Sequence, residues 1–356
     1  MNKPFSDLVI VELAGVLAGP SVGLFFAELG AKVIKIENPK TNGDVTRGWK
    51  SPLENKEDIS SAYYWSVNAG KDILFLDLTL SKDLETFYQL IKTADILISN
   101  YKLGDDIKLK VDYETLEQIN SQLIYASING FGSQNPRTAY DLILQAESGF
   151  MYMNGEKDSQ SLKMPVALID LLAGHQLKEA ILIALLKKYK TSTGSHISVS
   201  LFDSALASLA NQATNWLIAH HLPTAQGSLH PNIAPYGELF LTKDQHQITF
   251  AIGSNSQFKN LCEILGIDLY EKEQFKSNQQ RVANREKLYT LLNEKISLFT
   301  FDDLFNLCLK NDVPIGKIRN LKEVFELPEA QQMLHYFTNN HTTLTSVKSV
   351  AFQFLK

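Results

Sequence analysis

In the first 130 residues, short apolar runs rich in β-branched residues alternate with longer stretches whose apolar positions recur at helical spacing. The short runs predict strands at 7–13, 32–37, 72–78, 95–100 and 123–129. Helical patterns separate them, at 20–29, at 113–120 and from Ser81, a favourable N-cap residue. This alternation predicts βαβ units and a mostly parallel, doubly wound α/β sheet. In such sheets ligands bind in the crevice beyond the carboxyl ends of the strands.

The pattern changes in the second half of the chain. A long helix over 170–190, a strand over 195–202 and a helix over 203–221 continue the first region, and a segment rich in Pro, Gly and Ser follows at 223–235. Beyond it, the sequence predicts a β-hairpin and three helices. These elements form an α+β unit of about 90 residues, which is large enough for a second domain.

Composition narrows the class of protein. The 356 residues carry 34 Lys and Arg against 39 Asp and Glu, a net charge of −5, without the basic runs that nucleic-acid binding requires. No apolar stretch approaches the ~20 residues of a membrane span, and the N-terminus lacks a signal-peptide pattern. Cys262 and Cys308 are too few and too far apart for a disulfide framework or a zinc site. We therefore expect a soluble, cytoplasmic enzyme or binding protein without a metal.

The first strand-to-helix turn, LAGVLAGPSVG, contains Gly15, Gly19 and Gly23. Their spacing differs from the GxGxxG of dinucleotide-binding turns, so we interpret them as glycines for a tight turn and close packing. Free amides at the start of the following helix, near Pro20, could still hold an anion.

Asp170 ends the apolar run of MPVALID at the predicted start of the long helix. The simplest interpretation is a helix N-cap. The functional alternative is a carboxylate that faces a cleft, is kept ionised by the helix N-terminus and acts as a nucleophile. Residue pattern alone leaves both open.

Several ordered segments resemble the family III CoA-transferases, the group that includes formyl-CoA and carnitine-CoA transferases and α-methylacyl-CoA racemase. The resemblance runs from about Leu8 to Met333. It is carried by VELAGVLAGP (11–20), GAKVIKIENP (30–39), GDVTRGW (43–49), DILISNY (95–101), SINGFG (127–132), AYDLILQAESG (139–149), the Asp170 segment, KTSTGSHISVSLFDSAL (190–206), HPNIAPYGEL (230–239) and SNQQRVANREKL (277–288).

The resemblance implies a Rossmann-like large domain over 1–222, a linker at 223–236 and a small α+β domain over 237–324. Residues from about 325 to 356 then rejoin the large domain. It also implies an interlinked homodimer with no permanently bound cofactor. Coenzyme A arrives as part of an acyl-CoA substrate, and a small carboxylic acid is the second substrate.

The same resemblance assigns roles to individual residues. Asp170 matches the carboxylate that attacks the acyl-CoA thioester, and Tyr140 lies in the active-site segment. Expected contacts to coenzyme A come from Val16, Leu17, Lys35, Asn38, Asn100, Tyr101 and Arg137.

Three departures from the family pattern bear on specificity. Asn38 stands where an arginine often faces the phosphates of coenzyme A, and Leu17 replaces the glutamine of formyl-CoA transferase. The glycine-rich loop of that enzyme has no counterpart, since the region reads PNIAPYG. We therefore expect no formyl or oxalyl specificity.

Two other activities remain open at this stage. A racemase would need a histidine 30 residues before Asp170, but that position is Tyr140, although Asp141 and Glu238 match its accompanying acids. A phenol of pKa about 10 is a poor base at neutral pH, which favours the transferase. The third possibility is a homologue that binds CoA thioesters without catalysis, against which the retained Asp170 argues.

Overall fold

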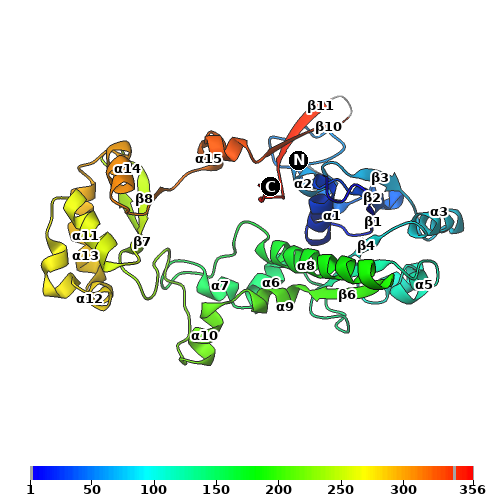
Figure 1. The fold of residues 1–356 in the computed structure, drawn as a ribbon, viewed down its shortest axis with the longest axis horizontal. Coiled ribbons are helices and arrows are strands. Elements are labelled where there is room, and N and C mark those ends of the chain that lie inside the picture. Colours follow the sequence, from blue (N-terminus) through cyan, green and yellow to red (C-terminus); the bar gives the residue numbers. More distant parts are fainter. Residues whose placement is uncertain (1–2, 340–341, 356) are drawn as a thin grey trace. The chain divides into compact units, whose positions relative to one another are not determined.

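The computed structural model describes residues 3–339 and 342–355 and forms two compact units (Figure 1). The first unit contains the chain up to Met151, Lys163–Pro223 and the chain from Gln332. The second contains Tyr152–Leu162 and Thr224–Gln331. The Pro-rich segment after residue 223 thus belongs to the second unit, together with a short piece that precedes the long helix.

A six-stranded parallel sheet is the centre of the first unit, with the order β3-β2-β1-β4-β5-β6. The strands are β1 (Val9–Glu12), β2 (Lys32–Glu37), β3 (Asp72–Phe75), β4 (Ile96–Ser99), β5 (Ile124–Asn129) and β6 (Ser195–Ser200). All six lie within runs that the sequence predicted as strands. The expected fold class, a Rossmann-like parallel sheet with a smaller α+β unit, is therefore confirmed.

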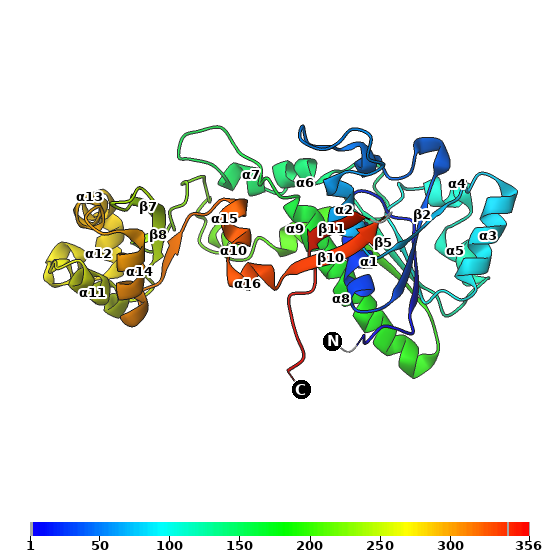
Figure 2. The ribbon, with the colours of Figure 1, turned by 90° about the horizontal axis from the view of Figure 1, so that it is seen from above.

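Helices cover both faces of this sheet (Figures 1 and 2). The helices from residue 18 to residue 217 are α1 (Ala18–Glu28), α2 (Ala62–Asn68), α3 (Ser81–Ile91), α4 (Asp105–Leu109), α5 (Tyr113–Glu117), α6 (Asp141–Glu147), α7 (Phe150–Met153), α8 (Leu168–Thr191), α9 (Leu201–Ala207) and α10 (Asn211–Leu217), with 3-10 turns η1 (Pro39–Thr41) and η2 (Val45–Gly48). Of these, α10 has no buried residue and projects away from the sheet in Figure 1. Because successive side chains of a strand point to opposite faces, β1 packs Ile10 against α1 and α8 and Val11 against the side that α3 and α5 cover.

Two glycines of the first turn have the packing role that the sequence suggested. A Cβ built on Gly19 would lie 2.3 Å from the Ala14 Cβ, and one built on Gly23 would lie 1.9 Å from a carboxylate oxygen of Glu12. Both contacts are impossibly short, so α1 approaches β1 only because these positions lack side chains. The helix itself begins at Ala18, before Pro20, whose missing N–H is one that the first turn leaves unbonded anyway.

Two local predictions were wrong, and one pair of strands was not predicted. Ser81 is the first residue of α3 and not its N-cap, which is Leu80. The helix expected over 203–221 is broken into α9 and α10 at Ala210, whose φ of +48° is incompatible with a continuous helix. The Thr- and Asn-rich C-terminal segment forms two antiparallel strands, β10 (Leu334–Asn339) and β11 (Thr342–Val347), which the sequence did not indicate.

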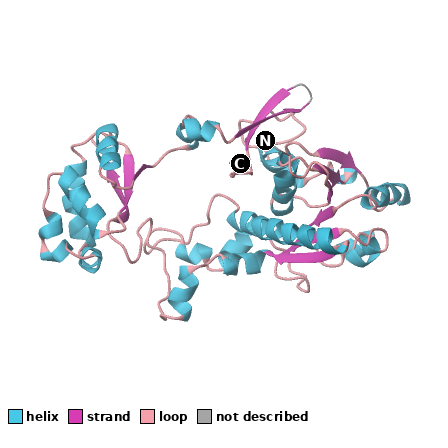
Figure 3. Cartoon of the chain, in the orientation of Figure 1, coloured by secondary structure: helices cyan, strands magenta, loops and turns pink. Residues whose placement is uncertain are grey.

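The second unit packs helices on a three-stranded antiparallel sheet, β7-β8-β9 (Figure 3). Its elements are β7 (Tyr236–Leu241), β8 (Gln247–Ala251), β9 (Ile315–Lys317), α11 (Asn255–Ile264), η3 (Leu269–Glu271), η4 (Glu273–Phe275), α12 (Asn278–Ala283), α13 (Arg285–Ile296), α14 (Phe301–Lys310), α15 (Leu321–Phe325) and α16 (Pro328–Gln331). A separate apolar core, which includes Cys262 and Cys308, holds this unit together. In the part of the chain that the structure describes, no helix is long and apolar enough to cross a membrane.

Candidate active site

A cleft of about 660 Å³ opens at the carboxyl ends of the central strands of the first unit. Its walls come from the β1–α1 turn, from the segments after β4 and β5, and from the start of α8. β1 and β4 are the neighbours at which the strand order reverses direction, and doubly wound folds bind their ligands at this point.

Seven of the nine site residues expected from the sequence line this one cleft. They are Val16, Leu17, Asn100, Tyr101, Arg137, Tyr140 and Asp170. These residues come from four separate segments of the chain, so the fold brings them together. A ligand bound in this cleft could contact both the N-terminus of α1 and Asp170.

Lys35 and Asn38 do not line the cleft. The Lys35 side chain is 1% exposed, and its ammonium pairs with Glu12 at 3.2 Å and Asp44 at 3.1 Å. Asn38 is exposed, and its side-chain oxygen accepts a hydrogen bond from the Lys40 amide at 2.9 Å, as the cap of η1. The resemblance implied that Lys35 contacts coenzyme A. In the structure Lys35 instead lies behind the cleft wall and supports it.

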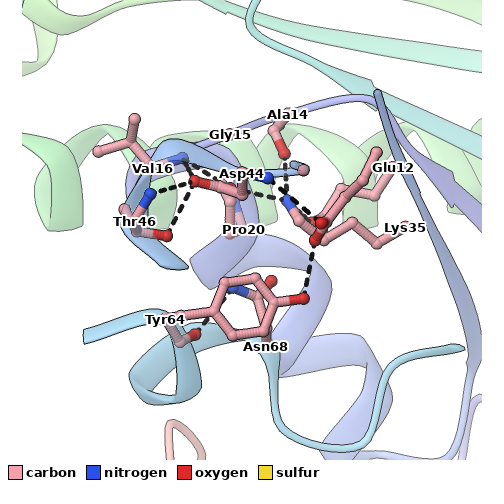
Figure 4. A network of polar contacts seen from close by, with 12 residues as sticks. Glu12, Ala14, Gly15, Val16, Pro20, Lys35, Asp44, Thr46, Tyr64 and Asn68 are labelled. Carbon is pink, nitrogen blue, oxygen red and sulfur yellow. Dashed lines mark hydrogen bonds and ion pairs between the residues drawn. The ribbon is translucent and has the colours of Figure 1, made fainter. Parts of the chain in front are cut away.

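The supporting layer is a network of buried charges below the β1–α1 turn (Figure 4). Parallel pairing sets Glu12 opposite Lys35 at the ends of β1 and β2, and Lys71 reaches the same Glu12 carboxylate at 2.8 Å. Lys35 also donates to the Ala14 carbonyl oxygen at 2.5 Å. Burial of so many charges is favourable only when each has a partner, so the network fixes the turn above it.

Asp170 is the third residue of α8, and it is 8% exposed. The N-cap of α8 is Ala167, so the N-cap interpretation of Asp170 is wrong. The capping bond comes from Asp141, whose carboxylate accepts from the Ile169 amide at 2.8 Å and from the Gln145 side-chain amide at 2.6 Å. Among residues 3–339 and 342–355, none forms a hydrogen bond with the Asp170 carboxylate, which stays available to a ligand.

Burial raises the pKa of Asp170 to about 7, and the negative charge of Asp141 adds to the effect. In the functional alternative drawn from the sequence, the helix N-terminus keeps this carboxylate ionised. Burial and the charge of Asp141 outweigh the effect of the helix N-terminus, so protonated and ionised forms coexist near neutral pH. An ionised carboxylate in such a poorly hydrated position is a stronger nucleophile than one in water.

Two further groups at the edge of the cleft were expected from the sequence. Tyr140 is 57% exposed and lies directly before α6. Arg137 forms a two-point ion pair with Glu147, at 2.5 and 3.0 Å, and its guanidinium lies over the Phe131 ring. Arg137 and Lys102 are the cationic side chains in the described lining, and both could meet an anionic substrate.

Glu238, which matches an acid of the racemases, has its partners within the second unit. Its carboxylate accepts from the Tyr236 amide at 2.5 Å and lies 3.4 Å from the Arg285 guanidinium. These contacts give Glu238 a structural function in its own unit.

Sequence reasoning missed Asp44 and Tyr63. Asp44 accepts a hydrogen bond from the Val16 amide, and its D-x-T pattern, typical of a carboxylate that bonds the backbone two residues on, was the available signal. Burial raises the pKa of the Tyr63 phenol, and the negative charges of Asp170 and Asp141 contribute. No local pattern distinguished Tyr63 from the other aromatic residues around it.

Comparisons with known proteins agree with this geometry. Residues 5–355 match the model of CoA-transferase family III. The succinate–glutarate CoA-transferase of Agrobacterium fabrum is 39% identical over 93% of this chain and 84% of its own, and the human succinyl-CoA:glutarate CoA-transferase is 35% identical over 94% and 75%. A crystal structure of a CaiB/BaiF family protein from Brucella suis superposes with a TM-score of 0.87 at 37% identity, covering 100% of this chain and 93% of that one. Within the described residues, no group of three or more His, Cys, Asp or Glu side chains could hold a metal ion.

Proposed function

The chain belongs to CoA-transferase family III and is an acyl-CoA:carboxylate CoA-transferase; we propose that it works through covalent intermediates on Asp170. The observation that carries the proposal is the Asp170 carboxylate itself. It lies in the cleft without a hydrogen-bond partner among the described residues, while Asp141 takes over the capping of α8.

In the first proposed step, the ionised Asp170 carboxylate attacks the thioester carbonyl carbon of the acyl-CoA. The carbon–sulfur bond breaks, coenzyme A leaves as a thiolate, and a mixed anhydride remains on Asp170. The thiolate then attacks the aspartyl carbonyl and releases the acyl group as a carboxylate, which leaves an aspartyl-CoA thioester. An acceptor carboxylate reverses both steps, so that one difficult exchange is divided into easier ones.

The start of α1 supplies the groups that would stabilise the charge that develops on each carbonyl oxygen. In the described part of the chain no side chain caps this helix, and Leu17 and Ala18 line the same cleft as Asp170. Backbone amides at a helix N-terminus favour negative charge, and such preorganised donors are a large part of catalysis in acyl transfer.

Succinyl-CoA and glutarate are the first substrates to test, because the Agrobacterium fabrum and human relatives are named for them. Coenzyme A enters as part of the substrate, and the proposal needs no permanently bound cofactor. The cytoplasmic location stays a prediction.

A homodimer is part of the proposal. The helix α8 exposes Ile183, Leu186 and Tyr189, at 68%, 63% and 72%, along one stripe of its surface. Such a stripe in a single chain indicates a surface that another chain covers. Sedimentation that finds a monomer at all protein concentrations would contradict this part.

The test of the reaction is chemical trapping. Incubation with succinyl-CoA and hydroxylamine should convert Asp170 to its hydroxamate, detected by peptide mass spectrometry. Asp170→Ala should abolish both the trapped product and CoA transfer while the protein still folds and binds coenzyme A. Tyr140→Phe should be milder, since its phenol is not part of the covalent sequence.

Other outcomes would identify the alternatives. Solvent deuterium at the acyl α-carbon without trapping would indicate a racemase, and silence in both assays would indicate a binding protein. Normal turnover by Asp170→Ala would refute the proposed nucleophile.

A further inference from the structure

The β1–α1 turn, whose residues line the cleft, is conformationally strained at Val16. Val16 has a φ of +70°, in the left-handed region that β-branched residues very rarely adopt. Such a conformation persists only where surrounding contacts hold it, and it is typical of functional sites. The next residues, Leu17 and Ala18, begin α1 and line the cleft.

Three side chains hold consecutive peptide groups of this turn. Lys35 donates to the Ala14 carbonyl oxygen, and Asn100 bonds both the amide and the carbonyl of Gly15, at 3.0 and 2.8 Å. The Val16 amide donates to the Asp44 carboxylate, at 3.1 Å from Oδ2 (Figure 4). Asp44 is thus the side chain that bonds the strained residue itself.

Asp44 is in turn held firmly. Its carboxylate accepts from the Thr46 amide at 3.0 Å and the Thr46 hydroxyl at 2.8 Å, and it pairs with Lys35 at 3.1 Å. The side chain is 2% exposed. The pKa of Asp44 is lowered, because Lys35 and Thr46 outweigh the effect of burial, so the acceptor is ionised when it bonds Val16.

The strained turn lies beside the helix that carries Asp170. A Cβ built on Gly174, one turn after Asp170, would lie 3.3 Å from the Ala18 carbonyl oxygen and 2.5 Å from the Ser21 hydroxyl. The starts of α1 and α8 therefore pack closely. A rotation of the Val16 peptide toward a relaxed φ would change the direction of the amides that follow it.

We infer that Asp44 is a positioning residue for CoA transfer, which holds Val16 in its left-handed conformation so that the first amides of α1 face the cleft. This inference rests on the proposed function. Asp44 does not line the cleft, and it acts on the reaction only through the Val16 peptide.

The chain offers a matched control in Asp77. Its carboxylate accepts from the Thr79 amide at 3.1 Å and the Thr79 hydroxyl at 2.6 Å, and it pairs with Lys40 at 2.7 Å. Asp77 thus repeats the D-x-T pattern and the ion pair of Asp44, with the same 2% exposure, at a place that neither bonds residue 16 nor lines the cleft.

The experiment is a double-mutant cycle of Asp44→Ala and Val16→Gly, with Asp77→Ala as control. Steady-state kcat and KM for succinyl-CoA and glutarate are measured beside the melting temperature. Asp44→Ala should lower kcat by about 10- to 100-fold, less than the roughly 100- to 1000-fold for complete loss of one oxyanion donor, because the amides remain but change direction. In the Val16→Gly background the same change should lower kcat far less, because glycine reaches positive φ without strain.

The melting temperature separates positioning from stability. Val16→Gly cannot replace the bonds of Asp44 to Thr46 and Lys35, so the double variant should regain kcat without regaining melting temperature. Asp77→Ala should melt lower with an unchanged kcat. Equal losses of kcat in both backgrounds, or an equal loss in Asp77→Ala, would overturn the inference.

Two further results are decisive. If Asp44→Ala does not fold, the cycle is run with Asp44→Asn, which keeps the side-chain shape. A wild-type protein without CoA transfer would refute the proposed function and this inference together. An active wild type whose Asp44 variants keep full kcat would refute the inference alone.

Discussion

The Asp141 carboxylate accepts a hydrogen bond from the Ile169 amide, 2.8 Å away, and so caps the helix on which Asp170 lies. Asp141 stabilises α8 from outside that helix, while Asp170, on the helix itself, has no hydrogen-bond partner among the described residues. Burial raises the pKa of Asp170, and the negative charge of Asp141 raises it further. Asp141 therefore both caps α8 and raises the pKa of the proposed nucleophile.

The first prediction concerns the pH dependence of turnover. In the proposed mechanism only ionised Asp170 attacks the thioester, so kcat/KM for acyl-CoA should rise with pH and level off above an inflection near pH 7. Asp141→Asn removes a negative charge, so it should move the inflection to lower pH. Identical pH profiles for both proteins would show that Asp141 does not influence the ionisation of Asp170.

The second prediction concerns stability. The folded-state pKa of Asp170 lies above its unfolded value, so the folded protein holds this proton more tightly between about pH 4 and 7. Its contribution to stability is full below about pH 4 and is lost as pH rises through 7. Asp170→Asn, which does not ionise, should therefore be more stable than wild type at pH 8, by a few kcal/mol of unfolding free energy at most, and should melt at a higher temperature. At pH 4 it should be no more stable than wild type. An advantage that persists at pH 4 would contradict this account.

The third prediction concerns substrate binding at Arg137. Arg137→Ala should raise KM for acyl-CoA roughly tenfold at little cost in kcat, because the guanidinium lines the cleft, where it would bind an anionic ligand, and has no part in the proposed covalent steps. Lys108→Ala is the control, since Lys108 forms an exposed ion pair with Asp105 and does not line the cleft. A fall in kcat at constant KM in Arg137→Ala would contradict the binding role.

The fourth prediction concerns the double hydrogen bond between Asn100 and Gly15. Asn100→Ala leaves both the amide and the carbonyl of Gly15 without their partner, which should cost about 1–3 kcal/mol of unfolding free energy and reduce turnover. Asn100→Asp should not restore either, because it offers a negative charge to the Gly15 carbonyl. Denaturant unfolding provides the measurement, and an unchanged stability in Asn100→Ala would refute the clamp.

The fifth prediction concerns the cysteines. Cys262 and Cys308 are fully buried, and burial raises the pKa of each thiol to about 12. Iodoacetamide at pH 8 should modify neither residue in the native protein and should leave turnover intact, because alkylation needs an accessible thiolate. Both residues should react after denaturation in guanidinium chloride. Loss of activity on native alkylation would contradict the structural role.

Local sequence determined the elements of the sheet. The run KVIKIE becomes β2 without a change of boundary, because β-branched apolar residues favour an extended, buried strand whatever their partners are. The same local signals missed the break at Ala210 and the pairing of β10 with β11. A strand pair whose outer face is polar gains its stability from its partner, and an apolar periodicity does not indicate it.

The sequence by itself also determined where the proposed nucleophile lies, since Asp170 ends an apolar run at a helix start and lies within segments that resemble a known family. Only the tertiary structure decided what surrounds it. Asp141 caps α8 from 28 residues away, Lys35 turns from the cleft to Glu12, and Asp44 reaches Val16 across 28 residues. Hydrogen bonding, burial and charge act through space, so contacts between distant segments set the pKa of Asp170 and the shape of the turn beside it.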